Sequence, residues 1–237
     1  MYAALHAPAG NQPFNDWFVP DTTQRFVLGT KQIAVDPYWG WGEFVYAKAS
    51  GAVAPRLLCV LSDAYLAVGV PNAANQGFPV CVAMGNMATL TFGWFMTEGV
   101  TPIVASATVA ADAALGITGV GTVGANTAGK QILGVRNRIA QTGTKTFANT
   151  QTLNGSSILI TNGYDGLFLG AALSGTGIPA SSLEAKLDPD GRTVYMGSAV
   201  GTIDKLATAT GSITLTGTWT GFTIAVIQTP FAQGAIT

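Results

Sequence analysis

Thr89-Leu-Thr-Phe-Gly-Trp-Phe-Met-Thr97 is the stretch of sequence that decides the fold class. From Leu90 to Met96 every second residue is large and apolar, and the residues between them are Thr, Gly and Phe. Side chains of a β-strand point alternately to its two faces, so this period of two predicts a strand with one apolar face.

The segments on both sides of this stretch carry the same signature. Short runs rich in β-branched and aromatic residues are separated by Gly, Asn and Pro, which favours strands joined by turns. The runs cover residues 43–49, 80–84 and 131–136. The best helical candidate is a single turn near residues 109–115, where Ala-Ala-Asp-Ala-Ala permits it. We therefore predict a β-domain over residues 25–150.

The C-terminal part of the chain is richer in Ser, Thr and Gly. Asp190-Gly191 predicts a tight hairpin, because this dipeptide tolerates a positive φ. Two alternating segments, residues 212–220 and 222–227, flank a glycine that would form another turn. We predict an antiparallel β-module over residues 151–237. The predicted fold class is therefore all-β, with two small antiparallel barrel-like or sandwich-like domains.

The first 24 residues differ from the rest of the chain. Their prolines exclude a regular helix or a central strand. Their aromatic residues are too many for a merely solvated tail. We predict an extended N-terminal arm over residues 1–24, which either lays its aromatic side chains on a partner or folds back on its own domain. The arm aromatics are Tyr2, Phe14, Trp17 and Phe18.

Charge is scarce along the whole chain: 10% of the residues are charged, 48% are hydrophobic, and the net charge is -1. A monomer of this size usually has about a quarter of its residues charged. Because interface cores are depleted in Lys, Glu and Asp, we predict an obligate oligomer or a part of a large assembly. The charge balance provides no footprint for nucleic acid or anionic lipid. No apolar run is long enough to span a membrane, and we expect no secretory signal.

Two glycine-rich motifs resemble nucleotide-binding loops. Residues 119–124 match G-x-G-x-x-G, but a poor helix follows them and no acidic residue stands near Thr144. Residues 124–130 match the P-loop up to Lys130, after which Gln131 replaces the required Ser or Thr. Without these partners neither motif holds a phosphate, so we interpret both as turns.

The sequence offers no constellation for catalysis. The single histidine, His6, lies in the arm, where nothing would hold it near a nucleophile. Asp188-Pro-Asp190-Gly191 begins like a calcium loop but lacks the later ligands, so a hairpin turn is the better interpretation. We therefore predict no enzymatic activity, no cofactor and no metal site.

The remaining candidates are two cysteines and a group of aromatic residues. Cys59 and Cys81 lie in apolar segments; buried reduced thiols are favoured, and one disulfide is the alternative. The aromatics near residue 40 are spaced by glycines and can stack on sugar rings or fill a protein interface, the commoner use. The candidate interface residues are Phe14, Trp17, Phe18, Trp39 and Trp41.

Three segments of the central part resemble head decoration, or cement, proteins of tailed bacteriophages. They are Trp41-Gly-Glu-Phe-Val-Tyr-Ala-Lys-Ala-Ser-Gly-Ala-Val-Ala, the segment from Gly93-Trp-Phe-Met-Thr-Glu-Gly-Val-Thr-Pro to Leu115, and Gly129-Lys-Gln-Ile-Leu-Gly-Val-Arg-Asn. The similarity covers residues 40–140. Residues 166–180 and 190–196 resemble a β-module found on phage fibres and decoration proteins. The arm and this module depart from a minimal decoration protein.

The resemblance implies a virion structural protein without enzymatic activity, made in the host cytoplasm and located on the capsid exterior. It also implies a homotrimer that binds the major capsid protein, clamps neighbouring subunits and stabilises the head. The main alternative is a tail fibre, spike or other receptor-binding component that recognises a host glycan. A glycan depolymerase is disfavoured because it would need paired carboxylates, and the acidic residues form no pair outside the turn with Asp188 and Asp190. A shell or tail-tube subunit is disfavoured by the absence of a predicted long helix.

Overall fold

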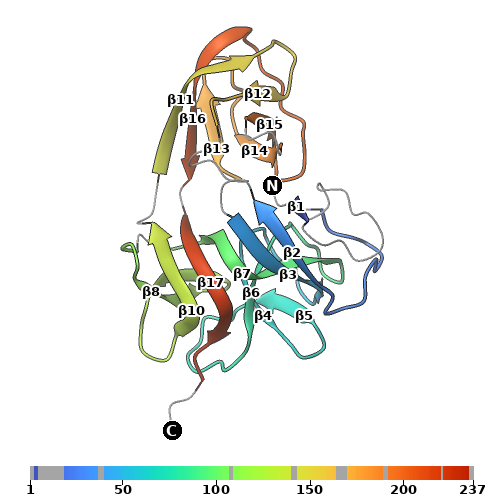
Figure 1. Ribbon diagram of the computed structural model, residues 1–237, viewed down its shortest axis with the longest axis vertical. Coiled ribbons are helices and arrows are strands. Elements are labelled where there is room, and N and C mark those ends of the chain that lie inside the picture. Colours follow the sequence, from blue (N-terminus) through green and yellow to red (C-terminus); the bar gives the residue numbers. More distant parts are fainter. Residues whose placement is uncertain are drawn as a thin grey trace. The chain divides into compact units, whose positions relative to one another are not determined.

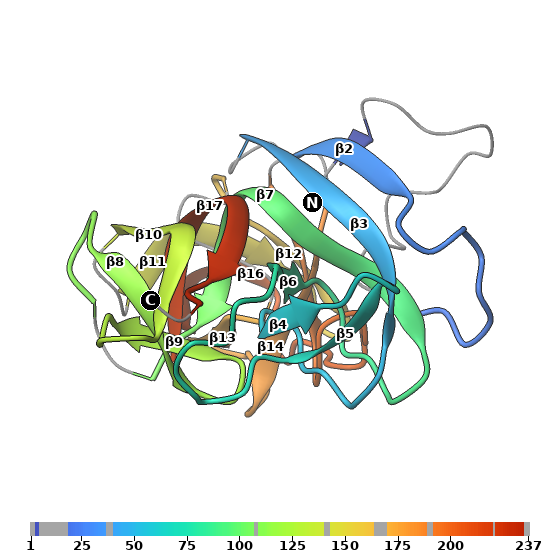
Figure 2. The ribbon, with the colours of Figure 1, turned by 90° about the horizontal axis from the view of Figure 1, so that it is seen from below.

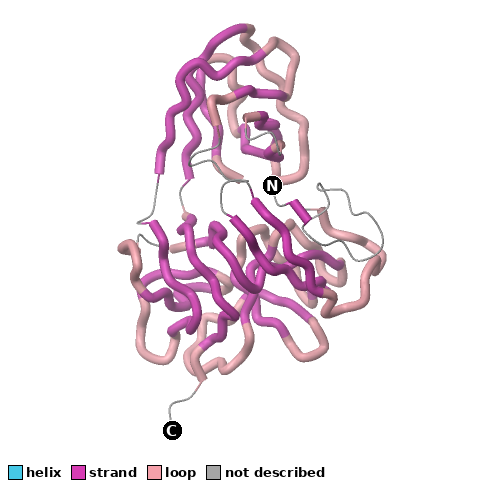
Figure 3. The backbone as a smooth tube through the Cα atoms, viewed as in Figure 1, coloured by secondary structure: helices cyan, strands magenta, loops and turns pink. Residues whose placement is uncertain are grey.

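The structure, a computed structural model, describes residues 3–4, 19–36, 40–106, 109–139, 143–163, 170–188, 192–219 and 221–234. These residues form strands, turns and loops and no helix (Figure 3), which confirms the all-β fold class. Within these ranges no helix is long and apolar enough to cross a membrane. The chain divides into two compact units. We call residues 142–220 the inserted barrel, and residues 2–141 with 221–237 the main unit.

The main unit contains one large sheet with the strand order β1-β2-β3-β5-β4-β6-β7-β17-β10-β8-β9. Its strands are β1 (Ala3–Ala4), β2 (Lys31–Asp36), β3 (Gly40–Ala49), β4 (Leu58–Leu61), β5 (Leu66–Gly69), β6 (Val80–Ala83), β7 (Phe92–Val104), β8 (Ala114–Gly119), β9 (Thr122–Ala125), β10 (Gln131–Ile139) and β17 (Phe222–Ala232). An additional pairing joins β3 directly to β7. The strands β3, β5, β4, β6 and β7 therefore close into a ring, which we call the β3–β7 ring (Figure 2).

The interior of the β3–β7 ring is filled mainly by small side chains. A ring of few strands encloses little space, so it is packed solid by its own residues. Phe95 is the one large aromatic residue of this described cluster and is fully buried. The other members are Val45, Ala47, Ala49, Val53, Cys59, Leu61, Ala67, Cys81, Ala83 and Met87.

The opposite faces of β3 and β7 form a second, aromatic core. Tyr46 and Trp94 are almost completely buried there, and their ring centroids lie 5.2 Å apart. The ring of Phe26 packs 5.1 Å from Tyr46 and 5.4 Å from Trp94. The prediction of a strand with one apolar face is therefore wrong for β7, because this strand lies between two cores. Leu90 precedes the strand and is exposed.

The inserted barrel is a closed ring of six strands in the order β11-β12-β15-β14-β13-β16. The strands are β11 (Gly143–Thr152), β12 (Ile158–Ile160), β13 (Ala172–Gly175), β14 (Ser182–Leu187), β15 (Thr193–Gly197) and β16 (Gly211–Trp219). Leu159, Val194 and Leu215 are fully buried in this unit. Its first strand, β11, pairs with its last, β16, so the two ends of the unit lie side by side.

The sequence placed the boundary between the two units differently. The predicted module over residues 151–237 included both β16 and β17 as neighbours around a glycine turn. In the structure β16 pairs with β11 and β13, whereas β17 lies between β7 and β10 in the main sheet (Figure 1). Alternation identifies a strand but not its partner, and the long separation of β17 from β10 in sequence concealed the pairing.

The predicted helical turn near residues 109–115 is also absent. Asp112 has a positive φ of 60°, and β8 begins at Ala114. The buried side chain of Asn137 donates hydrogen bonds to the carbonyl oxygens of Val109 (2.7 Å) and Ala110 (2.9 Å). These bonds fix the segment as a loop and override the weak local preference for helix.

Only parts of the predicted N-terminal arm fall within the described residues. Ala3 and Ala4 pair with β2, and Asp21 forms an isolated bridge with Phe92 on β7. The described parts of residues 1–24 therefore contact their own main unit. The arm aromatics, which decide between the two alternatives, lie outside the described residues.

Candidate interaction site

Trp41 lies on β3 and is 51% exposed. The neighbouring Gly42 pairs with Gly99 on β7, whose φ is +126°. A Cβ atom on Gly99 would lie 2.8 Å from the carbonyl oxygen of Trp41 and 2.9 Å from the Cα of Gly42. The two backbones approach closely because both residues are glycine, and this contact fixes where β3 presents the indole.

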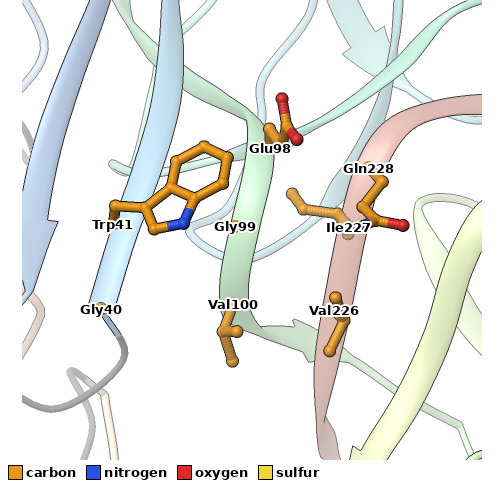
Figure 4. A pocket seen from close by; sticks show the side chains of 8 residues that line it. All are labelled: Gly40, Trp41, Glu98, Gly99, Val100, Val226, Ile227 and Gln228. Atoms are coloured by element: carbon orange, nitrogen blue, oxygen red, sulfur yellow. The ribbon is translucent and has the colours of Figure 1, made fainter.

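A shallow hollow of about 190 Å³ lies beside the indole, which we call the Trp41 hollow. Figure 4 shows the indole beside Gly99, with Glu98 and Gln228 at one end of the hollow and Val100 and Val226 at the other. The side chains come from β3, β7 and β17, which are adjacent in the sheet. An exposed tryptophan next to a mainly apolar hollow with one carboxylate and one amide at its rim is typical of a protein-binding anchor.

Other strands also present apolar side chains to solvent. On β5 the exposed residues Leu66 and Val68 alternate with buried ones, and Ile158 and Ile160 do the same on β12. Outward positions of strands that face water are usually polar. Single exposed apolar residues are ordinary, but paired outward positions on these two strands favour surfaces that other proteins cover.

Of the predicted interface residues, the structure describes only Trp41, which it places at the hollow. Phe14, Trp17, Phe18 and Trp39 lie outside the described residues. Sequence reasoning missed Glu98 and Gln228, which join Trp41 only because β7 pairs with both β3 and β17. No local pattern marks either residue, so only the strand pairing could have identified them.

The interpretation of both glycine-rich motifs as turns is confirmed. Residues 119–124 form the β8–β9 hairpin, with Gly121 at a φ of +67°. In the second motif Gly129 has a φ of +74°, and the Nζ atom of Lys130 donates a hydrogen bond to Oδ1 of Asn72 at 2.8 Å. The lysine is therefore held by a side-chain amide on a neighbouring loop.

The predicted hairpin at Asp190-Gly191 agrees with the strands that flank it. β14 and β15 pair antiparallel, with Leu187 opposite Val194. Residues 189–191 themselves lie outside the described residues. Within the described ranges, no three His, Cys, Asp or Glu side chains gather in a way that could hold a metal ion.

The two cysteines are free thiols, which confirms the favoured interpretation. Cys59 on β4 lies directly opposite Cys81 on β6, and both are fully buried inside the β3–β7 ring. Burial raises the pKa of both thiols well above the usual range, because the thiolate would lose its solvation. Both cysteines therefore act as small hydrophobic side chains in this core.

Comparisons with known proteins identify no relative. No protein-family model, no curated protein and no solved structure matches this chain.

Proposed function

We propose that this protein is a structural component of a phage virion that binds the outside of the capsid and clamps neighbouring major capsid protein subunits. The observation that carries the proposal is the exposed Trp41 beside an apolar hollow on a chain with few charges. Tryptophan is enriched among residues that dominate binding energy, because its large ring loses much solvent contact at little cost in side-chain entropy. The resemblance of residues 40–140 to cement proteins supports the same function.

Self-association is part of the proposal. The outward apolar pairs on β5 and β12 need a cover, and a homotrimer on the capsid would provide it through contacts between copies and with the shell. A protein that binds only the assembled shell stabilises it by mass action. Three copies joined in one trimer would add avidity, since the second and third contacts become intramolecular.

The test uses purified heads that lack the protein. The wild-type chain is expected to bind these heads in hundreds of copies and to raise the temperature at which they release DNA. Trp41→Ala is expected to weaken binding by about thirtyfold, which corresponds to about 2 kcal/mol. Phe78→Ala is the matched control, because Phe78 is also 51% exposed but does not line the Trp41 hollow.

Three results would contradict the proposal. The first is that the wild-type chain does not bind the heads. The second is that heads release DNA at the same temperature with and without the chain. The third is that Trp41→Ala and wild type bind the heads with equal affinity. A count of a few copies per purified virion would favour a fibre or spike component instead. Light scattering of the isolated chain tests the trimer separately.

A further inference from the structure

A second hollow lies at one end of the β3–β7 ring, and we call it the ring-mouth hollow. Its volume is about 320 Å³, which falls in the range of small-molecule sites, and barrel mouths are common places for such sites. All its lining residues belong to the main unit. Those that matter for its chemistry are Lys31, Glu43, Tyr65, Thr97, Pro230 and Phe231.

A fixed carboxylate and ammonium stand together in this hollow. Oε1 of Glu43 accepts hydrogen bonds from Nζ of Lys31 at 2.9 Å and from Oγ1 of Thr97 at 3.0 Å. The side chain of Glu43 is 22% exposed and that of Lys31 is 61% exposed. Among the described residues, no hydrogen bond to Oε2 of Glu43 is present. The pair therefore offers one acceptor and one donor side by side, with no net charge.

Two aromatic rings and two prolines supply the apolar part. Phe231 is 38% exposed. The ring of Tyr65 packs against Gly29, where a Cβ atom on the glycine would lie 2.4 Å from Cε2 of the tyrosine. Tyr65 and Thr229 both have positive φ angles, of 55° and 41°. Strained backbone of this kind persists where the surrounding structure holds it, and it concentrates at ligand sites.

We infer that the ring-mouth hollow binds one pyranose unit of a neutral saccharide. The apolar C–H face of a pyranose ring fits against Tyr65 and Phe231. Two neighbouring hydroxyls fit the polar pair, one donating to Oε2 of Glu43 and the other accepting from Nζ of Lys31. Such hydrogen bonds to charged groups are the stronger ones in proteins.

The charge and hydrogen-bonding pattern separates this ligand from other classes. An ion would have to compete with the Lys31–Glu43 pair, because each charge in the hollow already faces its opposite. A lipid chain would take Oε2 of Glu43 out of water without giving this oxygen a donor, which is costly. Proline-rich peptides also use aromatic grooves, but their proline nitrogens carry no hydrogen to donate to Glu43.

The experiment is saturation-transfer NMR with the full chain and a mixture of methyl pyranosides of glucose, galactose, mannose and N-acetylglucosamine. At least one of them is expected to receive saturation from the wild-type protein. Glu43→Gln and Phe231→Ala are each expected to weaken this binding by tenfold or more. Lys31→Gln is a further variant that changes an exposed side chain, so loss of folding would not explain a loss of binding.

Trp41→Ala and Val27→Ala are the controls, because both residues lie outside the ring-mouth hollow, and both variants are expected to bind the saccharide as wild type does. The inference is overturned if no pyranoside receives saturation, or if Glu43→Gln and Lys31→Gln bind like wild type. The inference goes beyond the proposed function and fails separately from it. Loss of head binding in Trp41→Ala with retained saccharide binding would support both, and head binding without saccharide binding would remove only this inference.

Discussion

The two units of this protein are both β-rings, but their cores are built differently. The β3–β7 ring is filled mostly by alanine, cysteine and valine, together with Phe95, and an aromatic layer covers the outside of two of its strands. The inserted barrel buries aliphatic side chains such as Leu215 and also several hydroxyls. The comparison teaches that β3 and β7 of the main unit are packed on both faces, one core being mainly of small side chains and the other aromatic, whereas the inserted barrel depends on one closed interior.

The buried hydroxyls of the inserted barrel hold its loops. Ser182 donates a hydrogen bond to the carbonyl of Pro179 at 2.7 Å, and Thr161 donates to the carbonyl of Gly163 at 2.8 Å. In the main unit a buried phenol also holds a loop. The phenol of Tyr46 donates to Asp21 at 2.7 Å and accepts from the backbone N–H of Arg25 at 3.2 Å.

The largest expected effect comes from emptying one core while leaving the other intact. Phe95→Ala is expected to destabilise the main unit by about 3–5 kcal/mol, because it leaves a cavity in a ring of small side chains. Leu215→Ala is expected to destabilise the inserted barrel by about 2–5 kcal/mol. Urea unfolding is followed by methyl NMR. The signal of Met96 on β7 reports on the main unit and is called the aromatic signal, and the signal of Met196 reports on the inserted barrel.

Each of these substitutions is the control for the other. The comparison holds if Phe95→Ala shifts the aromatic transition and leaves the Met196 transition in place. It is broken if both probes shift together in both variants, because the two units would then unfold as one cooperative body.

The next effect is that the two units lose stability in opposite directions of pH. Burial raises the pKa of Tyr46 to about 12, and hydrogen bonding to Asp21 adds to this. A pKa raised in the folded state stabilises the fold below the ordinary value near 10, and this stability is lost as the pH rises toward 12. In the inserted barrel, hydrogen bonds from Ser198 lower the pKa of Asp204, so its contribution is lost on acidification instead.

We therefore expect the stability of the main unit to fall by no more than about 2 kcal/mol between pH 10 and 12 through Tyr46. Tyr46→Phe removes this dependence, while the part due to the buried thiols of Cys59 and Cys81 stays. The measurement is the urea midpoint of the aromatic signal at a series of pH values. An unchanged slope above pH 10 in Tyr46→Phe would show that another group causes the alkaline loss.

The smallest effect concerns one polar side chain in each unit. Both amide atoms of Gln32 and the Oγ1 atom of Thr152 are buried without a hydrogen-bond partner in the described structure. Gln32→Met is expected to stabilise the main unit, and Thr152→Val the inserted barrel, each by about 1 kcal/mol. Thermal unfolding followed by the two unit-specific signals measures this, and each variant must leave the other unit unchanged. A loss of stability would mean that the native polar group has a partner such as ordered water.

The sequence predicted the elements better than their arrangement. Residues 80–84 and 131–136 carry local patterns, and the strands β6 and β10 are found there. Local patterns do not specify a partner, so the position of β17 in the main sheet was missed. The alternation in β7 predicts one apolar face, with Phe95 grouped among the Thr and Gly residues of the other face, because nothing local reveals that a second core lies on that side.

The interaction site shows the same limit. Trp41 was identified from its own sequence neighbourhood, where glycines flank aromatic residues. Glu98 and Gln228 lie on strands that meet Trp41 only through long-range pairing. The Lys31–Glu43 pair is twelve residues apart on two neighbouring strands, and no sequence motif distinguishes it from ordinary surface charges.

The place of β17 in the main sheet has a consequence for how the chain folds during translation. β10 ends at Ile139 and β17 begins at Phe222, yet β17 lies between β7 and β10. At about 5–20 residues per second, the ribosome completes β17 several seconds after β10. Until then the nascent chain has open edges on β7 and β10, which are sites for aggregation, while the inserted barrel already has all its strands. Rapid, autonomous folding of the inserted barrel would bring β17 to its place and shorten that exposed interval.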